Sequence, residues 1–113
     1  MSATAMRQLA SALDIFRVAA GREWQIQLLM FFLHVAAHDG CRQSVLTKAT
    51  GMSPASVSRC LDKLGSIDRH GNPGMKLISR KQDPDDYKHW RLFLTPRGQM
   101  MADLMATQLE EDV

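Results

Sequence analysis

The sequence contains no long hydrophobic run. Its longest apolar stretch begins at Leu28 and continues past His34 to Ala37, which is too short to span a bilayer. The first residues do not form a cleavage-type signal peptide, and only two cysteines are present, Cys41 and Cys60. Two cysteines are too few for a disulfide scaffold, and both thiols are expected to be reduced. Together these absences predict a cytoplasmic protein.

The common catalytic patterns are also absent. The sequence holds no nucleophile–base pair, no phosphate-binding glycine loop and no dinucleotide-binding fingerprint. Asp85 and Asp86 are adjacent carboxylates, but they fall in an expected turn, whereas acid–base catalysis needs a pocket. We therefore expect no enzymatic activity and no cofactor. With 113 residues and 45% apolar side chains, the chain is expected to form a single domain over residues 1–113.

The stretch from Ser44 to Leu64 has the pattern of a helix-turn-helix. Gly51 falls at the corner, where a residue without Cβ can take the left-handed conformation that ends a helix. Ser53 then follows as an N-cap, and Pro54 as the first residue of the second helix. The apolar or small residues expected to share one core are Leu46, Ala49, Met52, Val57, Leu61 and Leu64. A helical hairpin of an unrelated small domain is the alternative.

The second helix of this pattern presents small, hydroxyl and charged residues on its outer side. They are Ala55, Ser56, Ser58, Arg59, Asp62 and Lys63. Small hydroxyl residues let a helix enter the major groove of DNA, and arginine can bond phosphates or base edges there. The pattern therefore indicates binding to double-stranded DNA.

The charge of the chain is unevenly distributed. Residues 1–41 carry no net charge, residues 42–98 carry eleven basic and five acidic side chains, and residues 99–113 carry four acidic ones. The segment with the helix-turn-helix thus holds a net +6, although the whole chain holds only +2. A polyanionic partner is the simplest reason for this asymmetry. The alternative is a solvated surface of mixed charge.

Two helices are expected before the helix-turn-helix. One runs from about Thr4 to Ala20, with an amphipathic stripe of Met6, Leu9, Leu13, Phe16 and Ala20. The other runs from about Glu23 to His38 and is apolar over most of its circumference, which predicts a central buried helix.

A two-stranded hairpin is expected after the helix-turn-helix. Residues 65–74 are dense in turn formers and predict a loop, and residues 75–81 and 88–94 predict strands joined by a polar turn over 82–87. A helix-turn-helix followed by such a hairpin is a winged helix.

A last helix is expected to begin at Thr95-Pro96 and to end near Glu110. Its predicted apolar face consists of Met100, Leu104, Met105 and Leu109. The fold class is therefore α+β and mainly helical, a winged helix-turn-helix with a three-helix core and a two-stranded wing. Helices over 4–38 precede the helix-turn-helix and wing over 42–94, and a C-terminal helix follows over 95–113.

The segment 80–98 resembles the wing of the MarR family of winged-helix transcriptional regulators. That wing typically reads Arg, a few residues, Asp-Pro-x-Asp-x-Arg, a strand and Leu-Thr-x-x-Gly. Asp83-Pro84-Asp85-Asp86, Leu94-Thr95 and Gly98 stand at the matching places, and Lys88 replaces the arginine of the wing tip. The resemblance covers about residues 23–105 in element order.

The resemblance implies a homodimer, held by the N- and C-terminal helices, that regulates transcription, most often as a repressor. The helix at 54–64 would occupy the major groove, and the wing tip would reach the adjacent minor groove. Small aromatic ligands often bind in this family between the dimerisation helices and the DNA-binding lobe, so a small-molecule effector of unknown identity is a further expectation.

Roles in DNA binding can be assigned to individual side chains. Arg59, Ser56, Ser58 and Ala55 are expected to read or fit the groove, with Ser53 and Pro54 shaping the start of the helix; Lys63, Arg42 and Lys48 are expected to hold phosphates; and Lys88, His89 and Arg91 are expected to serve the wing. Asp86 is expected to buttress Lys88 or Arg91.

Two other functions fit parts of the pattern. The long 65–74 loop and Lys88 at the wing tip are also compatible with a winged helix that contacts protein, such as an adaptor in a replication or mobile-element complex. His34, His38 and Cys41 have the spacing His-x3-His-x2-Cys, which suggests a metal-responsive regulator; no fourth ligand is evident, and our prediction is that no metal is bound.

Overall fold

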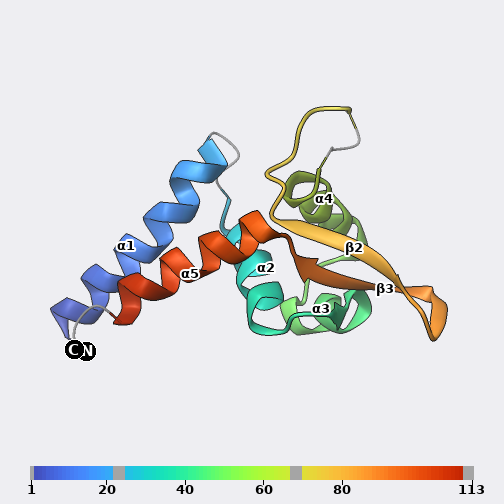
Figure 1. Cartoon of the computed structure of the whole chain (residues 1–113), viewed down its shortest axis with the longest axis horizontal. Helices are drawn as coiled ribbons and strands as arrows, with labels where there is room; N and C mark the ends of the chain where they lie inside the picture. Colours follow the sequence, from blue (N-terminus) through green and yellow to red (C-terminus); the bar gives the residue numbers. More distant parts are fainter. Residues whose placement is uncertain (1, 22–24, 67–69, 111–113) are drawn as a thin grey trace.

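The computed structural model describes residues 2–21, 25–66 and 70–110. In chain order these residues form α1 (Ala3–Ala20), α2 (Ile26–Ala37), β1 (Cys41–Arg42), α3 (Gln43–Thr50), α4 (Pro54–Leu64), β2 (Ile78–Asp83), β3 (Asp86–Leu94) and α5 (Pro96–Glu110) (Figure 1). Within the described ranges no helix is both long and apolar enough to cross a membrane. The predicted winged helix-turn-helix is confirmed, with α3 and α4 as its two helices.

The molecule consists of an arm and a lobe (Figure 1). α1 and α5 pack alongside each other to form the arm. α2, α3, α4 and the sheet form the lobe, and the β2–β3 hairpin extends beyond it as the wing (Figure 1). This shape accounts for the elongated dimensions of 45 × 29 × 26 Å.

Local sequence signals begin and end the helices as predicted. Gly51 ends α3 in the left-handed conformation, with φ of 68°. The Ser53 hydroxyl caps α4 by accepting a hydrogen bond from the backbone N–H of Ser56 at 3.1 Å, and Pro54 is the first residue of the helix. The corner of the helix-turn-helix is therefore set by residues within a few positions of it.

The core of the lobe is built around α2. Its buried side chains are Leu28, Leu29, Phe31, Phe32 and Val35. The ring centroids of Phe32 and of Phe16 on α1 are 5.6 Å apart, and this contact joins the arm to the lobe. On the other side α2 packs against α3, α4 and β3.

The predicted apolar faces of the long helices are partly wrong. α2 is covered on one side only, and Ile26, Met30 and Leu33 are exposed; Trp24 and Glu23 lie outside the described residues. On the other helices the exposed apolar residues that were expected in the core are Met6, Leu9, Ala49, Met100, Leu104 and Leu109. Met101 with Met105 is the buried pair on α5, since residues four apart lie on the same side of a helix.

The sheet differs from the prediction in strand number and turn length. It has three antiparallel strands in the order β1-β3-β2, because Cys41 and Arg42 pair with Leu92 and Arg91. A two-residue strand carries no periodicity that a sequence could reveal. β2 and β3 also extend to Asp83 and Asp86, so the turn is tighter than the expected 82–87.

A buried carboxylate joins the three strands at the base of the wing. Oδ2 of Asp83 accepts hydrogen bonds from Nε of Arg42 at 3.1 Å and from Nε of Arg91 at 3.0 Å. Arg91 also donates to the backbone carbonyl of Gly40 at 2.8 Å. Asp83, rather than the predicted Asp86, is therefore the partner of Arg91. Asp86 instead accepts from the backbone N–H of Lys88, not from its ammonium group.

The hydrogen bonds of Asp83 favour its ionised form. The backbone N–H of Asp85 is the largest influence, and with Arg42 and Arg91 it holds the pKa of Asp83 below its usual value. A lowered folded-state pKa stabilises the fold above the unfolded pKa of about 3.9, and this stabilisation is lost as the pH falls through the folded-state pKa.

We therefore expect Asp83→Asn to lower the melting temperature by several degrees near neutral pH. The difference from the unsubstituted protein should shrink as the pH falls below about 4, where the carboxyl of the unfolded chain becomes protonated, and it should be lost once the pH is below the lowered pKa of Asp83 in the fold. Melting curves followed by circular dichroism across this range test the prediction. Asp85→Asn, at an exposed carboxylate of the same turn, is the control and should change little. An unchanged melting temperature for Asp83→Asn at neutral pH would contradict the role given to this network.

Candidate nucleic-acid interface

α4 presents the predicted polar face on the outside of the lobe. Ala55 and Arg59 are exposed, and Ser56 and Ser58 are partly exposed. Nη2 of Arg59 donates a hydrogen bond to the Ser56 hydroxyl at 3.3 Å, and that hydroxyl lies 3.0 Å from the hydroxyl of Ser53. These contacts lay the guanidinium along the first turns of the helix, the part that enters the major groove in helix-turn-helix proteins.

The wing carries exposed side chains beyond its tight turn. Tyr87 and Lys88 are both exposed. Nδ1 of His89 lies 2.7 Å from Oδ2 of Asp86. The backbone N–H of Lys88 and then the His89 side chain lower the pKa of Asp86, which keeps this carboxylate ionised. His89 is thereby held against the wing, whereas the ammonium group of Lys88 makes no hydrogen bond or ion pair with the described residues.

A hollow of about 400 Å³ brings the helix-turn-helix and the wing onto one surface. Its walls come from α3, the start of α4 and β3, and its lining residues are Gln43, Ser44, Thr47, Lys48, Pro54, Lys88, His89 and Trp90. Lys48 on α3 and Lys88 on β3 are far apart in the sequence, and the structure brings both into the lining of this hollow.

Two of the predicted phosphate-binding or wing residues have a structural partner instead. Arg42 and Arg91 both bond Asp83, and their side chains are only about one-third exposed, at 36% and 37%. They hold the base of the wing, and their contact with DNA stays a prediction. Lys63 lines a hollow between α4 and the start of α2 together with Gln25, Gln27, Ser56 and Arg59, and its contact with phosphate stays a prediction.

The cysteine and histidine residues do not assemble into a site. Among the described residues, no group of three His, Cys, Asp or Glu side chains is placed to hold a metal ion, and this includes His34, His38 and Cys41. Burial raises the pKa of both the Cys41 and Cys60 thiols. Cys60 is buried in the core, as its apolar neighbours on α4 predict.

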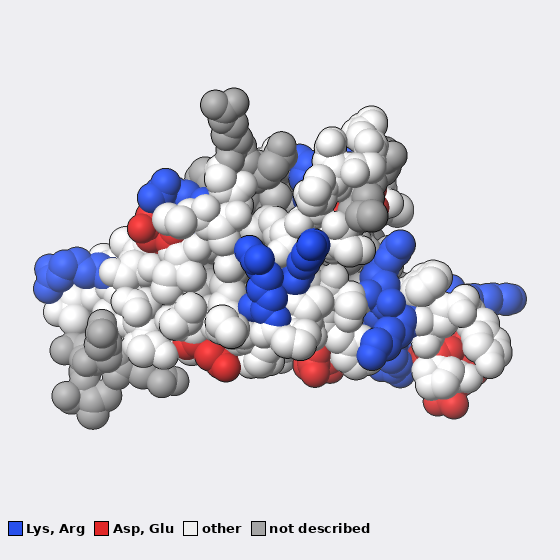
Figure 2. Space-filling model, turned by 45° about the horizontal axis from the view of Figure 1, so that its top comes forward, with Lys and Arg blue, Asp and Glu red and all other residues white. Residues whose placement is uncertain are grey.

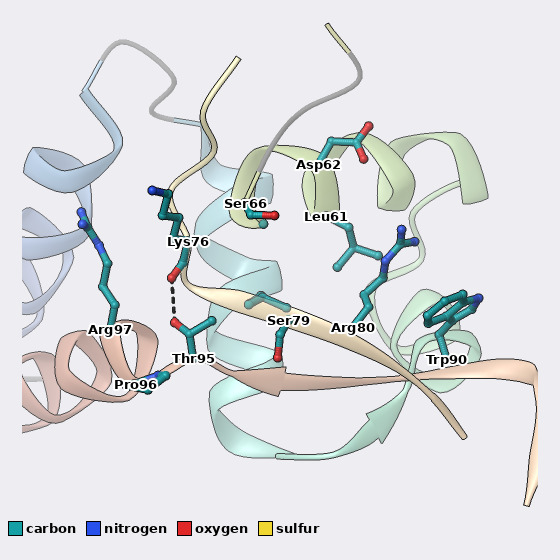
Figure 3. A pocket seen from close by; sticks show the side chains of 12 residues that line it. Leu61, Asp62, Ser66, Lys76, Ser79, Arg80, Trp90, Thr95, Pro96 and Arg97 are labelled. Carbon is teal, nitrogen blue, oxygen red and sulfur yellow. Dashed lines mark hydrogen bonds between the residues drawn. The ribbon is translucent and has the colours of Figure 1, made fainter. Parts of the chain in front are cut away.

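Sequence reasoning missed Arg80 as part of this surface. Its guanidinium carbon lies 5.2 Å from the ring centroid of Trp90. The two side chains stand at one end of a second hollow, of about 720 Å³, between α4, β2 and the start of α5 (Figure 3). Lys76 and Arg97 stand at the other end (Figure 3). Only the strand register, with Gln82 opposite Trp90, brings Arg80 and Trp90 to one face.

Basic side chains recur across this side of the molecule. Figure 2 shows Lys and Arg from the middle of the molecule to the end of the wing, while several acidic side chains lie along the lower edge. Since residues 42–98 contribute most of the basic side chains, the charge asymmetry of the sequence becomes a property of the lobe and wing.

No protein-family model matches the chain, and no curated protein matches its sequence. Solved structures do match. The S. aureus MepR–DNA complex has a TM-score of 0.65 and 20% identity, and the match covers 96% of this chain and 74% of that one. A MarR transcriptional regulator from Methanosarcina mazei has a TM-score of 0.63 and 17% identity, covering 94% and 74%. Reduced AbfR bound to DNA has a TM-score of 0.64 and 10% identity, covering 88% and 65%.

The matches to these neighbours cover between 88% and 96% of the chain. Their identities are low, so the match establishes the fold. The chain has the winged-helix fold of MarR-family transcriptional regulators, which is the fold that its wing sequence predicts.

Proposed function

We propose that the protein is a cytoplasmic transcriptional regulator, most simply a repressor, that binds specific sites in double-stranded DNA as a homodimer. The observation that carries this proposal is the shared surface of α3, α4 and the wing. Lys48 and Lys88 line the hollow on this surface, and Arg59 is exposed on α4. None of the three is paired with a carboxylate of the described residues. Cations without acidic partners retain their charge for an anionic ligand.

The two parts of this surface suit different parts of DNA. The outer side of α4 is narrow and polar at its start, where Ala55, Ser56 and Ser58 leave room for base edges. The wing offers an ammonium group at Lys88, which suits a phosphate. Sequence readout is therefore assigned to Arg59 and its neighbours, and backbone contact to Lys48 and Lys88. Two structural neighbours, MepR and AbfR, were solved in complex with DNA, which supports DNA binding by this fold.

The arm supports association with a second copy. Its exposed apolar side chains are Met6 and Leu9 on α1 and Met100, Leu104 and Leu109 on α5. Burial of such side chains against the same surface of another copy removes them from water. A dimer of this kind presents two α4 helices to successive major grooves, about one helical turn of DNA apart.

An adaptor that contacts only protein is the competing function. A gel-shift titration against random genomic fragments at two salt concentrations separates the two. Binding that is strong at low salt and weaker at high salt supports the regulator. Absence of binding at low salt rules it out.

Arg59→Ala should cost about 1–3 kcal/mol of binding free energy at a specific site, because it removes a base contact. Affinity for unrelated sequence should fall much less, so the ratio of specific to nonspecific affinity decreases. Fluorescence anisotropy with a selected site and a scrambled site measures both values. An equal loss on both sequences would contradict base readout by Arg59.

Lys88→Ala should weaken binding to all sequences similarly. Loss of one phosphate contact lowers the slope of log affinity against log salt by about 1 for each wing that touches DNA. The same anisotropy titrations at several salt concentrations give this slope. An unchanged slope would show that Lys88 does not contact the backbone.

Leu104→Lys should shift the protein from dimer to monomer and weaken its binding to DNA, because it places a charge in the apolar surface of the arm. Sedimentation velocity measures the oligomeric state. Val45→Lys, at an exposed apolar residue on α3, is the matched control and should leave the dimer intact. A monomeric unsubstituted protein would exclude the proposed assembly.

A further inference from the structure

The contact between Arg80 and Trp90 has a second feature besides its 5.2 Å distance. Trp90 lines both the hollow between α3 and the wing and the hollow between α4 and β2. Trp90 is 38% exposed, so it is not simply part of the core. The stacked pair therefore stands where the wing meets the helix-turn-helix, between the surfaces assigned to the major and minor grooves.

The hollow that Arg80 lines carries more basic than acidic side chains. Lys76 and Arg97 line the same hollow, and Asp62 is the acidic side chain among its described lining residues. Arg80 forms no salt bridge with a carboxylate of the described residues, and its side chain is exposed. A guanidinium stacked on an indole keeps the edge of its planar fork available for a phosphate.

The stack also reduces the freedom of a long side chain. An unrestrained arginine loses conformational entropy when it binds, and holding it in place beforehand lowers that cost. In a winged-helix complex, the phosphate backbone that separates the major groove from the minor groove runs between the recognition helix and the wing. A restrained guanidinium at this junction has the position and the chemistry to meet that backbone.

We propose that Arg80 and Trp90 form a preorganised clamp on the phosphate backbone that crosses between α4 and the wing. Arg80 contacts the phosphate, and Trp90 is a positioning residue that acts through Arg80. This inference rests on the proposed DNA-binding function and adds to it a contact that is independent of base sequence.

Lys81 in the same hairpin provides a matched control for Arg80. Nζ of Lys81 lies 5.3 Å from the ring centroid of Phe93, which gives a second cation–aromatic pair in the same hairpin. Lys81 follows Arg80 directly, and successive side chains of a strand point to opposite faces. Lys81 therefore matches Arg80 in charge, exposure and aromatic contact, but it faces away from the proposed path of the DNA.

The test is a double-mutant cycle on DNA affinity, measured at several salt concentrations. Arg80→Ala should weaken binding about tenfold on specific and scrambled sites alike. It should also lower the salt slope by about 0.9 for each Arg80 that contacts a phosphate. Lys81→Ala should change affinity and slope little, because a charge facing away from the DNA is screened by salt.

Trp90→Leu tests the positioning role. It should weaken binding less than Arg80→Ala does, because the mobile arginine keeps its charge. In the Arg80→Ala background it should have no further effect, since the residue through which it acts is gone. Trp90→Phe keeps an aromatic face for Arg80 and should retain most of the affinity of the unsubstituted protein. Circular dichroism melts of each variant show whether the fold is retained, and the Phe variant carries the test if the Leu variant does not fold.

The outcomes separate this inference from the function on which it rests. If the unsubstituted protein binds DNA but Arg80→Ala keeps its affinity and salt slope, the clamp is wrong and the proposed function stands. If Trp90→Leu weakens binding equally in both backgrounds, Trp90 acts only through packing. If the unsubstituted protein binds no DNA at low salt, the proposed function itself fails.

Discussion

The geometry of the lobe depends on one buried carboxylate, that of Asp83. Burying a charge is costly unless it is paired and hydrogen-bonded, so this carboxylate requires Arg42 and Arg91 around it. Arg42 directly precedes α3, and Arg91 lies in β3 and also bonds Gly40. Because one side chain joins all three strands, the wing cannot change its angle to the helix-turn-helix without exposing or unpairing this charge.

A second constraint links α4 to the arm. Residues 75–77 do not begin β2 as expected; their backbone N–H groups instead bond the carbonyls of Lys63, Gly65 and Leu64 at the end of α4. The Thr95 hydroxyl then donates to the carbonyl of Lys76 at 2.6 Å, just before α5 (Figure 3). A Cβ at Gly98 would lie 2.1 Å from the carbonyl oxygen of Leu77, so only glycine allows α5 to pass this closely. The orientation of α4 is thereby tied to the helix on which the proposed dimer depends.

Local signals explain what could be predicted. Gly51, Ser53 and Pro54 act on residues within one turn, so the helix-turn-helix corner and the start of α4 followed from the sequence. The three-stranded sheet could not be predicted in the same way. Its strand pair of Cys41 with Leu92 and its hydrogen bond from Arg42 to Asp83 join residues about forty or more positions apart. For the same reason Arg80 was missed, since its relation to Trp90 depends on strand register. The long helices contain more apolar residues than the fold of a single chain can bury. Periodicity alone could not decide which of them would be buried.

The Asp83 network also changes how the positive charge of the lobe should be understood. Arg42, Arg91 and Asp83 together carry one net positive charge, so five of the six net positive charges of residues 42–98 come from side chains outside this network. The side chains proposed to contact DNA differ in how far they are held in place. Lys88 is exposed on β3, whereas Arg59 is hydrogen-bonded to Ser56 and Arg80 is stacked on Trp90. A mobile lysine can follow phosphates of many sequences, while restrained arginines require DNA of one geometry. Selectivity would then arise both from base contacts at α4 and from how well the DNA backbone fits the fixed angle between α4 and the wing.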